Sequence, residues 1–401
     1  MSGLTPIVRF GDDAATRSLR HSVREWLEEW LPDEFRATAA NPDYLPRDAH
    51  ERAVEFCRRL HEQGWFVPQW PAEYGGGGRG VVEQVVIREE LAYAGAPLVN
   101  TNGVNMLAPV LFRYGTPEQK EEHLPLIARS ERMWAQGYSE PEAGSDLASL
   151  KMTARRDGDH YVLQGQKTWT SNGVLADWIF VLARTSPVGK SRREGISFFL
   201  VDLETPGITR RPIRSMTGYA TFAEEFFDEV RVPATHLVGA EGDGWRVAKS
   251  LLDAERSNVT RAAQAQRFLD ELVEWCRARR GRPNDPLADP MNRAALARAA
   301  EKTEVGRALS YRVAQNQAQG TLDAALPSLS KLYHAEFTAE LRALGAQILG
   351  PAGQLMPDDP DALLHGHFSD GLLLSLLHRI GGGTSEIQRD VIATAALALP
   401  R

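Results

Sequence analysis

The hydrophobic period of this 401-residue chain changes twice, and that change is the strongest constraint on its fold. Up to about Arg129, and again after Gly244, apolar residues recur every three to four positions, as is typical of amphipathic helices. Between about Met133 and Val232 the chain instead forms short β-rich segments separated by Gly, Pro or Asp-Gly. The order helical, β, helical predicts two helical layers flanking a small β domain.

Local patterns place the expected elements. The first helical part has one apolar face at Leu19, Val23, Trp26 and Leu27, a second helix over 49–63, and a turn over 64–71. The expected β segments are His160–Gln164, Trp178–Ala183, Ile196–Asp202 and Glu225–Val232, with a hairpin at Asp157-Gly158. Later helices are expected to begin near Trp245, Met291, Pro327 and Thr384, with Pro327 at a first helical position.

We therefore expect an α+β protein that is mainly α. Its predicted parts are an N-terminal helical domain (1–130), a small β-barrel-like domain (131–240) and a C-terminal four-helix bundle (241–401). A chain of this length is expected to hold two or three packed units and can bury a large cofactor.

Composition narrows the classes of function. Hydrophobic residues make up 43% and charged residues 25%, as in ordinary soluble globular proteins. No apolar run approaches the roughly 20 residues that cross a bilayer, and the first twenty residues lack an apolar signal core. We therefore expect a cytoplasmic protein that does not interact with membranes.

Charge and cysteine content point to a small-molecule partner. The net charge is −7 and arginines are interleaved with acids, so no nucleic-acid partner is expected. Cys57 and Cys276 lie far apart without His or Cys neighbours, so neither a disulfide nor a metal site is expected. The glycines at 75–80 satisfy G-x-G-x-x-G but do not follow a hydrophobic strand, so a dinucleotide fold is not indicated.

Two segments of the β part are rich in hydroxyl, amide and aromatic side chains. Residues 136–146 read QGYSEPEAGSD, and residues 165–173 read GQKTWTSNG. The first segment alone could be an ordinary capped turn. Together the two segments favour a site for a polar heterocycle, with Trp169 covering one ring face and a hydroxyl meeting the ring edge.

Both segments resemble, in residue type, order and separation, the flavin-binding signatures of the acyl-CoA dehydrogenases. The resemblance extends over nearly the whole chain, through the turn at 64–78, the end of the β domain at 230–233, and the string GGTSEIQR at 382–389. It implies bound FAD, an acyl-CoA substrate, an electron-transfer flavoprotein as electron acceptor, and a homo-oligomer, with a tetramer expected.

The resemblance also assigns roles to single residues. In the β domain it places Gln136, Tyr138 and Ser139 along the flavin, Ser145 at the flavin loop and the pantetheine side of the substrate, and Trp169, Thr170 and Ser171 at the isoalloxazine. Ser171 stands where the family usually has a threonine near N5. In the C-terminal part it places Gln347 and Gly350 in the adenine-side loop, and Thr384, Ser385 and Glu386 where a helix N-terminus meets a phosphate or ribityl oxygen.

Two positions depart from the family pattern or leave a choice open. Pro351 replaces a glycine that is usual in the adenine-side loop. Arg279, Arg280 and Arg282 surround Gly281, and any of the three could be the arginine that the family places after its long helix.

Desaturation of a thioester needs a base for the α proton and donors to the thioester carbonyl. In many family members a Glu directly precedes the Gly-Thr-Ser string, and here that position is Gly382. A second position known in the family, as in isovaleryl- and long-chain acyl-CoA dehydrogenases, matches Glu255. On a continuous helix Glu255 would share an inward face with Leu251, Val259 and Ala262, where burial raises a carboxyl pKa.

Several alternatives remain open at this stage. Glu255 could instead form a salt bridge, for example with Arg256. The resemblance lets the Gly382 backbone N–H bind the thioester carbonyl, and it places Asp253 and Arg256 near the CoA ligand. A non-catalytic FAD-binding subunit of a mixed assembly, or a flavin oxidase or monooxygenase on the same scaffold, are the competing functions. Acyl chain length, branching, and CoA versus carrier-protein thioesters are not distinguished.

Overall fold

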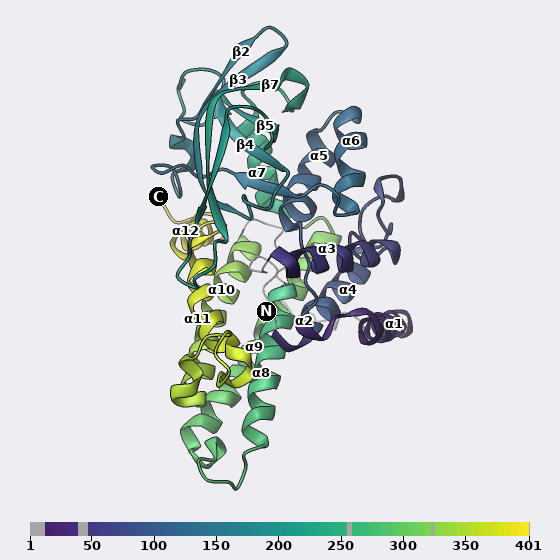
Figure 1. Ribbon diagram of the computed structural model, residues 1–401, viewed down its shortest axis with the longest axis vertical. Coiled ribbons are helices and arrows are strands. Elements are labelled where there is room, and N and C mark those ends of the chain that lie inside the picture. Colours follow the sequence, from purple (N-terminus) through teal and green to yellow (C-terminus); the bar gives the residue numbers. More distant parts are fainter. Residues whose placement is uncertain (1–12, 39–46, 255–258, 322–324, 401) are drawn as a thin grey trace. The chain divides into compact units, whose positions relative to one another are not determined.

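The computed structural model describes residues 13–38, 47–254, 259–321 and 325–400 (Figure 1). The first helical part contains α1 (Ala14–Trp30), α2 (Asp33–Thr38), α3 (Arg47–Glu62), α4 (Val81–Ala94), a π-helical turn (Asn102–Leu107), α5 (Ala108–Tyr114) and α6 (Pro117–Ala128). Local chemistry fixes their ends. The Asp13 carboxylate caps α1 by accepting the Thr16 N–H at 2.9 Å, and Thr116 and Gln119 form a capping box at α6.

The middle of the chain forms one eight-stranded sheet. Its strands are β1 (Trp134–Gly137), β2 (Thr153–Asp157), β3 (His160–Ser171), β4 (Trp178–Arg184), β5 (Ile196–Asp202), β6 (Ile208–Ile213), β7 (Phe222–Pro233) and β8 (Leu237–Val238). The order is β6-β7-β3-β2-β4-β5-β8, and β1 pairs in parallel with β4. The predicted segments correspond to β3, β4, β5 and β7, and the predicted hairpin joins β2 to β3, with Gly158 at φ +63°.

The core of this sheet consists of side chains from several strands. Strands β4 and β5 are buried on both faces over six successive residues each, so they read as continuous apolar runs instead of alternating ones. The interior cluster includes Ile179, Val181, Phe199, Val201 and Phe227. The helix α7 (Gly244–Ala254) packs against β5 and α5.

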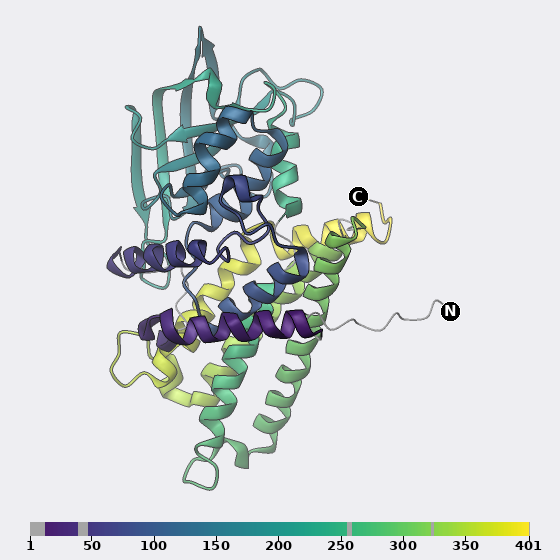
Figure 2. The same cartoon turned by 90° about the vertical axis from the view of Figure 1, so that its right-hand side faces the viewer.

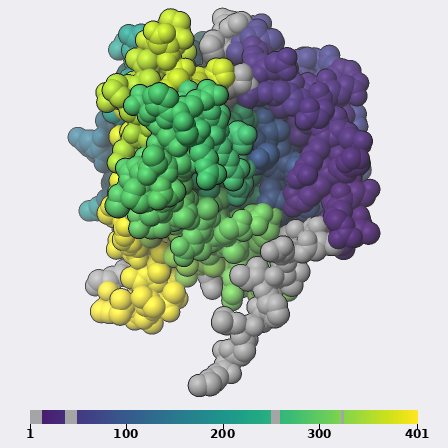
Figure 3. All heavy atoms as spheres, turned by 90° about the horizontal axis from the view of Figure 1, so that it is seen from below, coloured from purple at the N-terminus to yellow at the C-terminus, as the bar shows by residue number. Residues whose placement is uncertain are grey.

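The remaining helices are α8 (Val259–Arg277), α9 (Pro290–Ala318), α10 (Ala325–Leu349), α11 (His367–Ile380) and α12 (Ser385–Ala395). The long helices α8, α9 and α10 run side by side (Figures 1 and 2). The green atoms of this part of the chain form a continuous surface on the face seen in Figure 3. Pro327 lies at the third residue of α10, not at the first. The first-turn N–H groups have no intrahelical partner, so a proline is tolerated there.

The chain has the predicted α+β class, with N-terminal helices, a middle β domain and C-terminal helices. Its internal contacts divide into two compact units that cut across this order. One unit contains α1, α2, α4 and α8 to α12, and the other contains α3, α5, α6, the sheet and α7. Helix α4 explains the division because it packs against α1, α8 and α9. The three-domain boundaries drawn from sequence stay a prediction.

Two other features are absent from the described parts of the chain. No helix there is long and apolar enough to span a bilayer. No group of three or more His, Cys, Asp or Glu side chains in those ranges could hold a metal ion.

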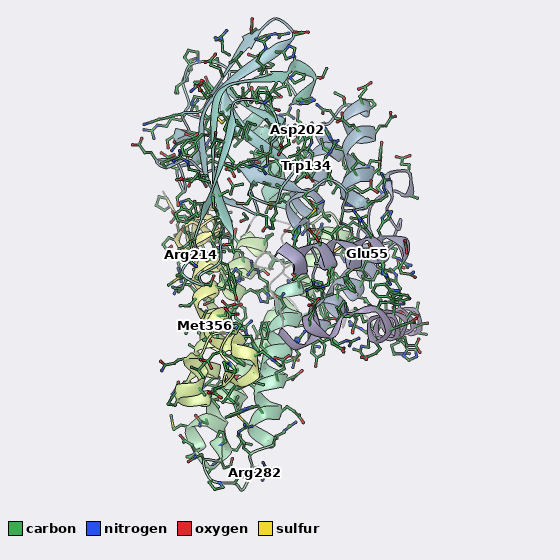
Figure 4. All side chains as sticks on the ribbon, in the orientation of Figure 1. Glu55, Trp134, Asp202, Arg214, Arg282 and Met356 are labelled. Carbon is green, nitrogen blue, oxygen red and sulfur yellow. The ribbon has the colours of Figure 1, made fainter. Side chains whose placement is uncertain are left out.

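Several histidines are buried in the neutral form, among them His123 and His334. The Arg132 guanidinium donates to His123 Nδ1 at 2.6 Å, and because a guanidinium cannot accept, the His123 ring must be neutral at that nitrogen. His123 also packs edge-on against Trp134, which Figure 4 labels on β1. In the other unit, His334 Nε2 lies 2.9 Å from the Ser310 hydroxyl. Burial lowers the pKa of both His123 and His334 to about 4.

This burial predicts a loss of stability in mild acid. Between pH 6.5 and 4 the unfolded chain binds protons at both histidines and the folded chain does not. The free energy of unfolding therefore falls with falling pH, by about 1.4 kcal/mol per unit of pKa difference for each histidine. Denaturant titrations across this range should show a shallower pH dependence for His123→Gln than for the parent. The exposed His21 is the control, and an unchanged slope in His123→Gln would contradict the assignment.

Candidate active site

The two polar segments of the β domain lie against each other. The Thr168 N–H donates to the Ser139 carbonyl at 3.0 Å, and the Lys167 ammonium donates to the Tyr138 carbonyl at 3.3 Å. Lys167 is fully buried and forms an ion pair with Glu140 at 2.8 Å. The Glu140 carboxylate also accepts the N–H groups of Lys151 and Met152, at 2.6 and 3.0 Å. The sequence segments 136–146 and 165–173 therefore form one local site.

Trp169 is the most prominent feature of that site. Its side chain is 61% exposed, and its ring meets Phe222 edge-on at 5.9 Å. Ser171, two residues further along β3, is half-buried, and its backbone carbonyl accepts a hydrogen bond from the Asn102 side chain at 3.4 Å. A large exposed aromatic ring, two residues before a half-buried serine, suits the face of a planar heterocycle. Gln136 and Ser139 are half-buried, and Ser145 is exposed.

The hydroxyls of Tyr138 and Thr170 lie inside the β domain, and the flavin contacts that the family resemblance implies for these two residues stay a prediction. Tyr138 packs edge-on against Phe180 and Phe198, and burial raises its pKa well above the usual range. Thr170 is fully buried and its hydroxyl donates to Glu225 at 2.5 Å. The reason is a bulge in the β3–β7 pairing between Lys167 and Thr170, which shifts the alternation so that Trp169 points outward.

Glu225 is a residue that the sequence reasoning missed. It is fully buried on β7, and burial raises its pKa to about 7. The signal was present in the sequence, because Glu225 stands between Ala223 and Phe227 at the alternate positions that face inward. Lys167 and Glu140 were likewise inside the quoted segments without being assigned a role.

The C-terminal part of the predicted site is the glycine turn before α12. Gly382 and Gly383 have φ angles of +64° and +86°, which favour glycine. The turn carbonyls are engaged, since Lys331 donates to Gly383 O at 2.5 Å and Gln388 donates to Gly382 O at 3.2 Å. The backbone N–H groups of Gly382 and Gly383 make no hydrogen bond to any residue that the structure describes.

The start of α12 fits a polar ligand atom. Thr384 caps this helix by accepting the Ile387 N–H at 3.2 Å, and Glu386 is exposed. The Ser385 hydroxyl is buried without a hydrogen-bond partner among the described residues. An unpaired buried hydroxyl beside unengaged N–H groups at a helix N-terminus is suited to an anionic or hydroxyl-bearing ligand. Burial lowers the pKa of the nearby Lys331 to about 8.

The adenine-side residues lie at the end of α10. Gln347 is exposed in its last turn, and Gly350, at φ +67°, opens a 3₁₀ turn over Gly350–Gln354 that accommodates Pro351. Of the three arginines after α8, Arg279 stacks on Trp275 at 3.8 Å. Arg280 and Arg282 are exposed, and Arg282 is labelled at the connection to α9 in Figure 4.

The predicted base is not among these residues. Glu255 and Arg256 lie outside the described residues, and Asp253 belongs to the last turn of α7, with its side chain outside the description as well. Of the three face partners, Val259 and Ala262 are buried at the start of α8. The β-domain candidates and Asp253 thus belong to one unit, and the candidates on the adenine-side turn and at the start of α12 belong to the other.

Known protein families match this chain over nearly its whole length. Sequence models of the acyl-CoA dehydrogenase N-terminal, middle and C-terminal domains match residues 5–131, 135–230 and 242–397. The chain is 41% identical over 389 residues to the acyl-CoA dehydrogenase IpdE1 of Mycobacterium tuberculosis, covering 95% of this chain and 97% of that relative.

Two solved structures are similar along their full length. The Tcur3481-Tcur3483 steroid ACAD has a TM-score of 0.87 and 33% identity, covering 98% of this chain and 100% of that one. The ChsE4-ChsE5 complex from Mycobacterium tuberculosis has a TM-score of 0.85 and 33% identity, covering 100% of both chains. The chain therefore belongs to the acyl-CoA dehydrogenase family of FAD-dependent flavoproteins, and it is an oxidoreductase that acts on the CH–CH group of acyl-CoA thioesters.

Proposed function

We propose that this chain binds FAD and removes the α proton of an acyl-CoA with Glu255, while the Gly382 N–H binds the thioester carbonyl. The observation that carries this proposal is the backbone at Gly382. Its φ of +64° suits glycine and strains any larger residue, and its N–H is not engaged by the described residues. The backbone donor is therefore kept while the base is supplied from Glu255.

The residues proposed to hold FAD form two separate groups. Trp169, Ser171, Gln136, Ser139 and Ser145 form the β-domain part, with Thr170 contributing backbone groups. Gln347, Gly350, Thr384, Ser385 and Glu386 form the C-terminal part. The unpaired Ser385 hydroxyl and the exposed Trp169 ring are the structural features that support this fit. Bound FAD would supply N5 as the acceptor of the β hydride.

Groups of the protein are proposed to remove the α proton, stabilise the carbonyl oxygen and bind the CoA part of the substrate. Glu255 takes the α proton on a carboxylate oxygen. The Gly382 N–H stabilises the negative charge that develops on the carbonyl oxygen during proton removal. Asp253, Arg256 and Ser145 are proposed to frame the CoA part of the substrate.

A bulky, steroid-type acyl group is our proposed substrate class. A Cβ at Gly382 would meet no atom of the described residues within 4 Å, so the space directly beside this backbone donor is open. A similar structure is of a steroid ACAD, which supports a polycyclic acyl group over a short straight chain.

We propose that the chain forms a tetramer and passes electrons to an electron-transfer flavoprotein. Family members often form oligomers, which supports the homotetramer. The two similar structures pair differently named chains, Tcur3481 with Tcur3483 and ChsE4 with ChsE5, which supports a mixed tetramer as the second arrangement.

The first prediction concerns the purified protein. It should be yellow, with one FAD per subunit, because both parts of the proposed FAD site are present in this one chain. Flavin absorbance gives the stoichiometry, and sedimentation velocity should give the mass of a tetramer. A colourless protein that takes up no FAD on reconstitution would overturn the FAD assignment, and a monomer with fully bound FAD would overturn the homotetramer.

The second prediction concerns the base. Glu255→Gln should keep FAD and acyl-CoA binding but slow anaerobic flavin bleaching by about 10²- to 10⁴-fold, the usual contribution of a positioned base. The exposed Glu274→Gln on α8 is the matched control and should bleach at the parent rate. A parent-like rate in Glu255→Gln would show that the base is another group.

The same assay separates the competing functions. A parent protein that holds FAD but is bleached by no acyl-CoA would be a non-catalytic subunit. Rapid reoxidation of the bleached flavin by oxygen would indicate an oxidase.

A further inference from the structure

The β domain contains a buried carboxylate that the reaction proposed above does not use. Glu225 on β7 lies opposite Lys167 on β3 and opposite Arg210 on β6. Its Oε2 accepts the Thr170 hydroxyl at 2.5 Å, and its Oε1 has no partner among the described residues. Gly173 leaves room for this carboxylate, since a Cβ there would stand 2.2 Å from Oε1. The packing at Gly173 therefore leaves room for the Glu225 carboxylate, of which one oxygen has no hydrogen-bond partner among the described residues.

The two cationic side chains opposite Glu225 form ion pairs with other carboxylates. Lys167 is paired with Glu140, and Arg210 donates to Glu204 at 2.8 Å. The neighbouring Glu224 adds a like charge. No cation within the described residues forms an ion pair with Glu225, so burial is the main influence and raises its pKa to about 7. The group therefore changes its charge near neutral pH.

Thr170 lies in a strained stretch of backbone. Trp169 and Asn172 both have positive φ angles, of 60° and 59°, which non-glycine residues adopt at a cost and only when neighbours hold them. The Thr170 hydroxyl bond to Glu225 fixes the middle of this stretch. Arg210 fixes its end by donating to the carbonyls of Gly173 and Ala176, at 3.3 and 2.9 Å.

We propose that Glu225 is a positioning residue, whose carboxylate holds Trp169 and Ser171 through Thr170 in the arrangement that binds the flavin, and whose protonation loosens FAD. This inference rests on the proposed placement of FAD against Trp169 and Ser171. An ionised carboxylate accepts a hydroxyl about twice as strongly as a neutral acid does. The strained stretch is therefore held best when Glu225 is charged.

The sign of the pH effect follows from this linkage. Above pH 7 Glu225 is ionised and the stretch is ordered, so FAD binds tightly. As the pH falls through 7 the dissociation constant for FAD should rise, by roughly fivefold for the difference between a charge-assisted and a neutral hydrogen bond. By reciprocity, FAD binding near pH 7 should release protons.

The test is a titration of full-length, FAD-free protein with FAD between pH 6 and 8.5, followed by flavin fluorescence. The parent should show the rise in dissociation constant with a midpoint near 7. Glu225→Gln and Thr170→Val should both show a dissociation constant that does not depend on pH, and Thr170→Ser should restore the dependence. Glu224→Gln, on the adjacent and half-exposed position, is the matched control: it should keep the pH dependence, with a midpoint below that of the parent because a neighbouring like charge is removed. A parent without pH dependence, or a Glu225→Gln variant that keeps it, would overturn the proposal.

A second readout does not need FAD. Amide hydrogen exchange of residues 168–174 in the FAD-free protein should be faster in Glu225→Gln than in the parent at pH 8, and equal in the two proteins at pH 6. Comparing the two proteins at one pH removes the intrinsic effect of pH on exchange. If no FAD binds at any pH, the proposed function fails, and this comparison still decides whether Glu225 orders the stretch. Equal exchange at pH 8 would refute the positioning role.

Discussion

The buried ion pair between Lys167 and Glu140 is the interaction on which the β-domain part of the site depends. Taking two charges out of water is costly, and the cost is offset only when both charges are fully hydrogen-bonded. Here Glu140 accepts from Lys167 and from the backbone of Lys151 and Met152, and Lys167 also reaches the Tyr138 carbonyl. Losing either partner would leave an uncompensated charge inside the sheet. The pair thus ties the loop after β1 to β3 at the place where Trp169 leaves the sheet.

The two parts of the proposed FAD site both contain residues with positive φ angles, but different local interactions hold the backbone in each part. In the β domain the stretch around Trp169 has positive φ angles at non-glycine residues, and it is hydrogen-bonded by Arg210 of β6 and Glu225 of β7. Before α12, glycines take the left-handed conformations without strain, and Lys331 and Gln388 bind the turn carbonyls. The first arrangement presents a ring face and a hydroxyl, and the second presents backbone N–H groups. Each arrangement by itself suits a different portion of a dinucleotide.

Periodicity predicted much of this architecture because a 3.6-residue or 2-residue repeat is visible in a single sequence. It located β3, β4, β5 and β7 and the helical runs on either side of the sheet. Periodicity could not show the bulge between Lys167 and Thr170. One inserted residue moves every following side chain of the strand to the opposite face of the sheet, and it leaves the composition of the segment unchanged. The hydroxyl of Thr170 is therefore inside the domain. Nor does an apolar face reveal its partner, so the grouping of α4 with α8 and α9 needed three-dimensional structure.

The glycine at 382 shows why a missing side chain can be informative. A residue with a Cβ would have to adopt a φ of +64° there, at a cost of order 1–3 kcal/mol, although no neighbouring atom blocks it. Writing a glutamate back at this position would thus impose backbone strain on the turn whose N–H groups are unengaged. The backbone of the turn therefore favours glycine over a residue that carries a carboxylate. This preference is the physical reason for proposing that the base is supplied by another part of the chain, at Glu255.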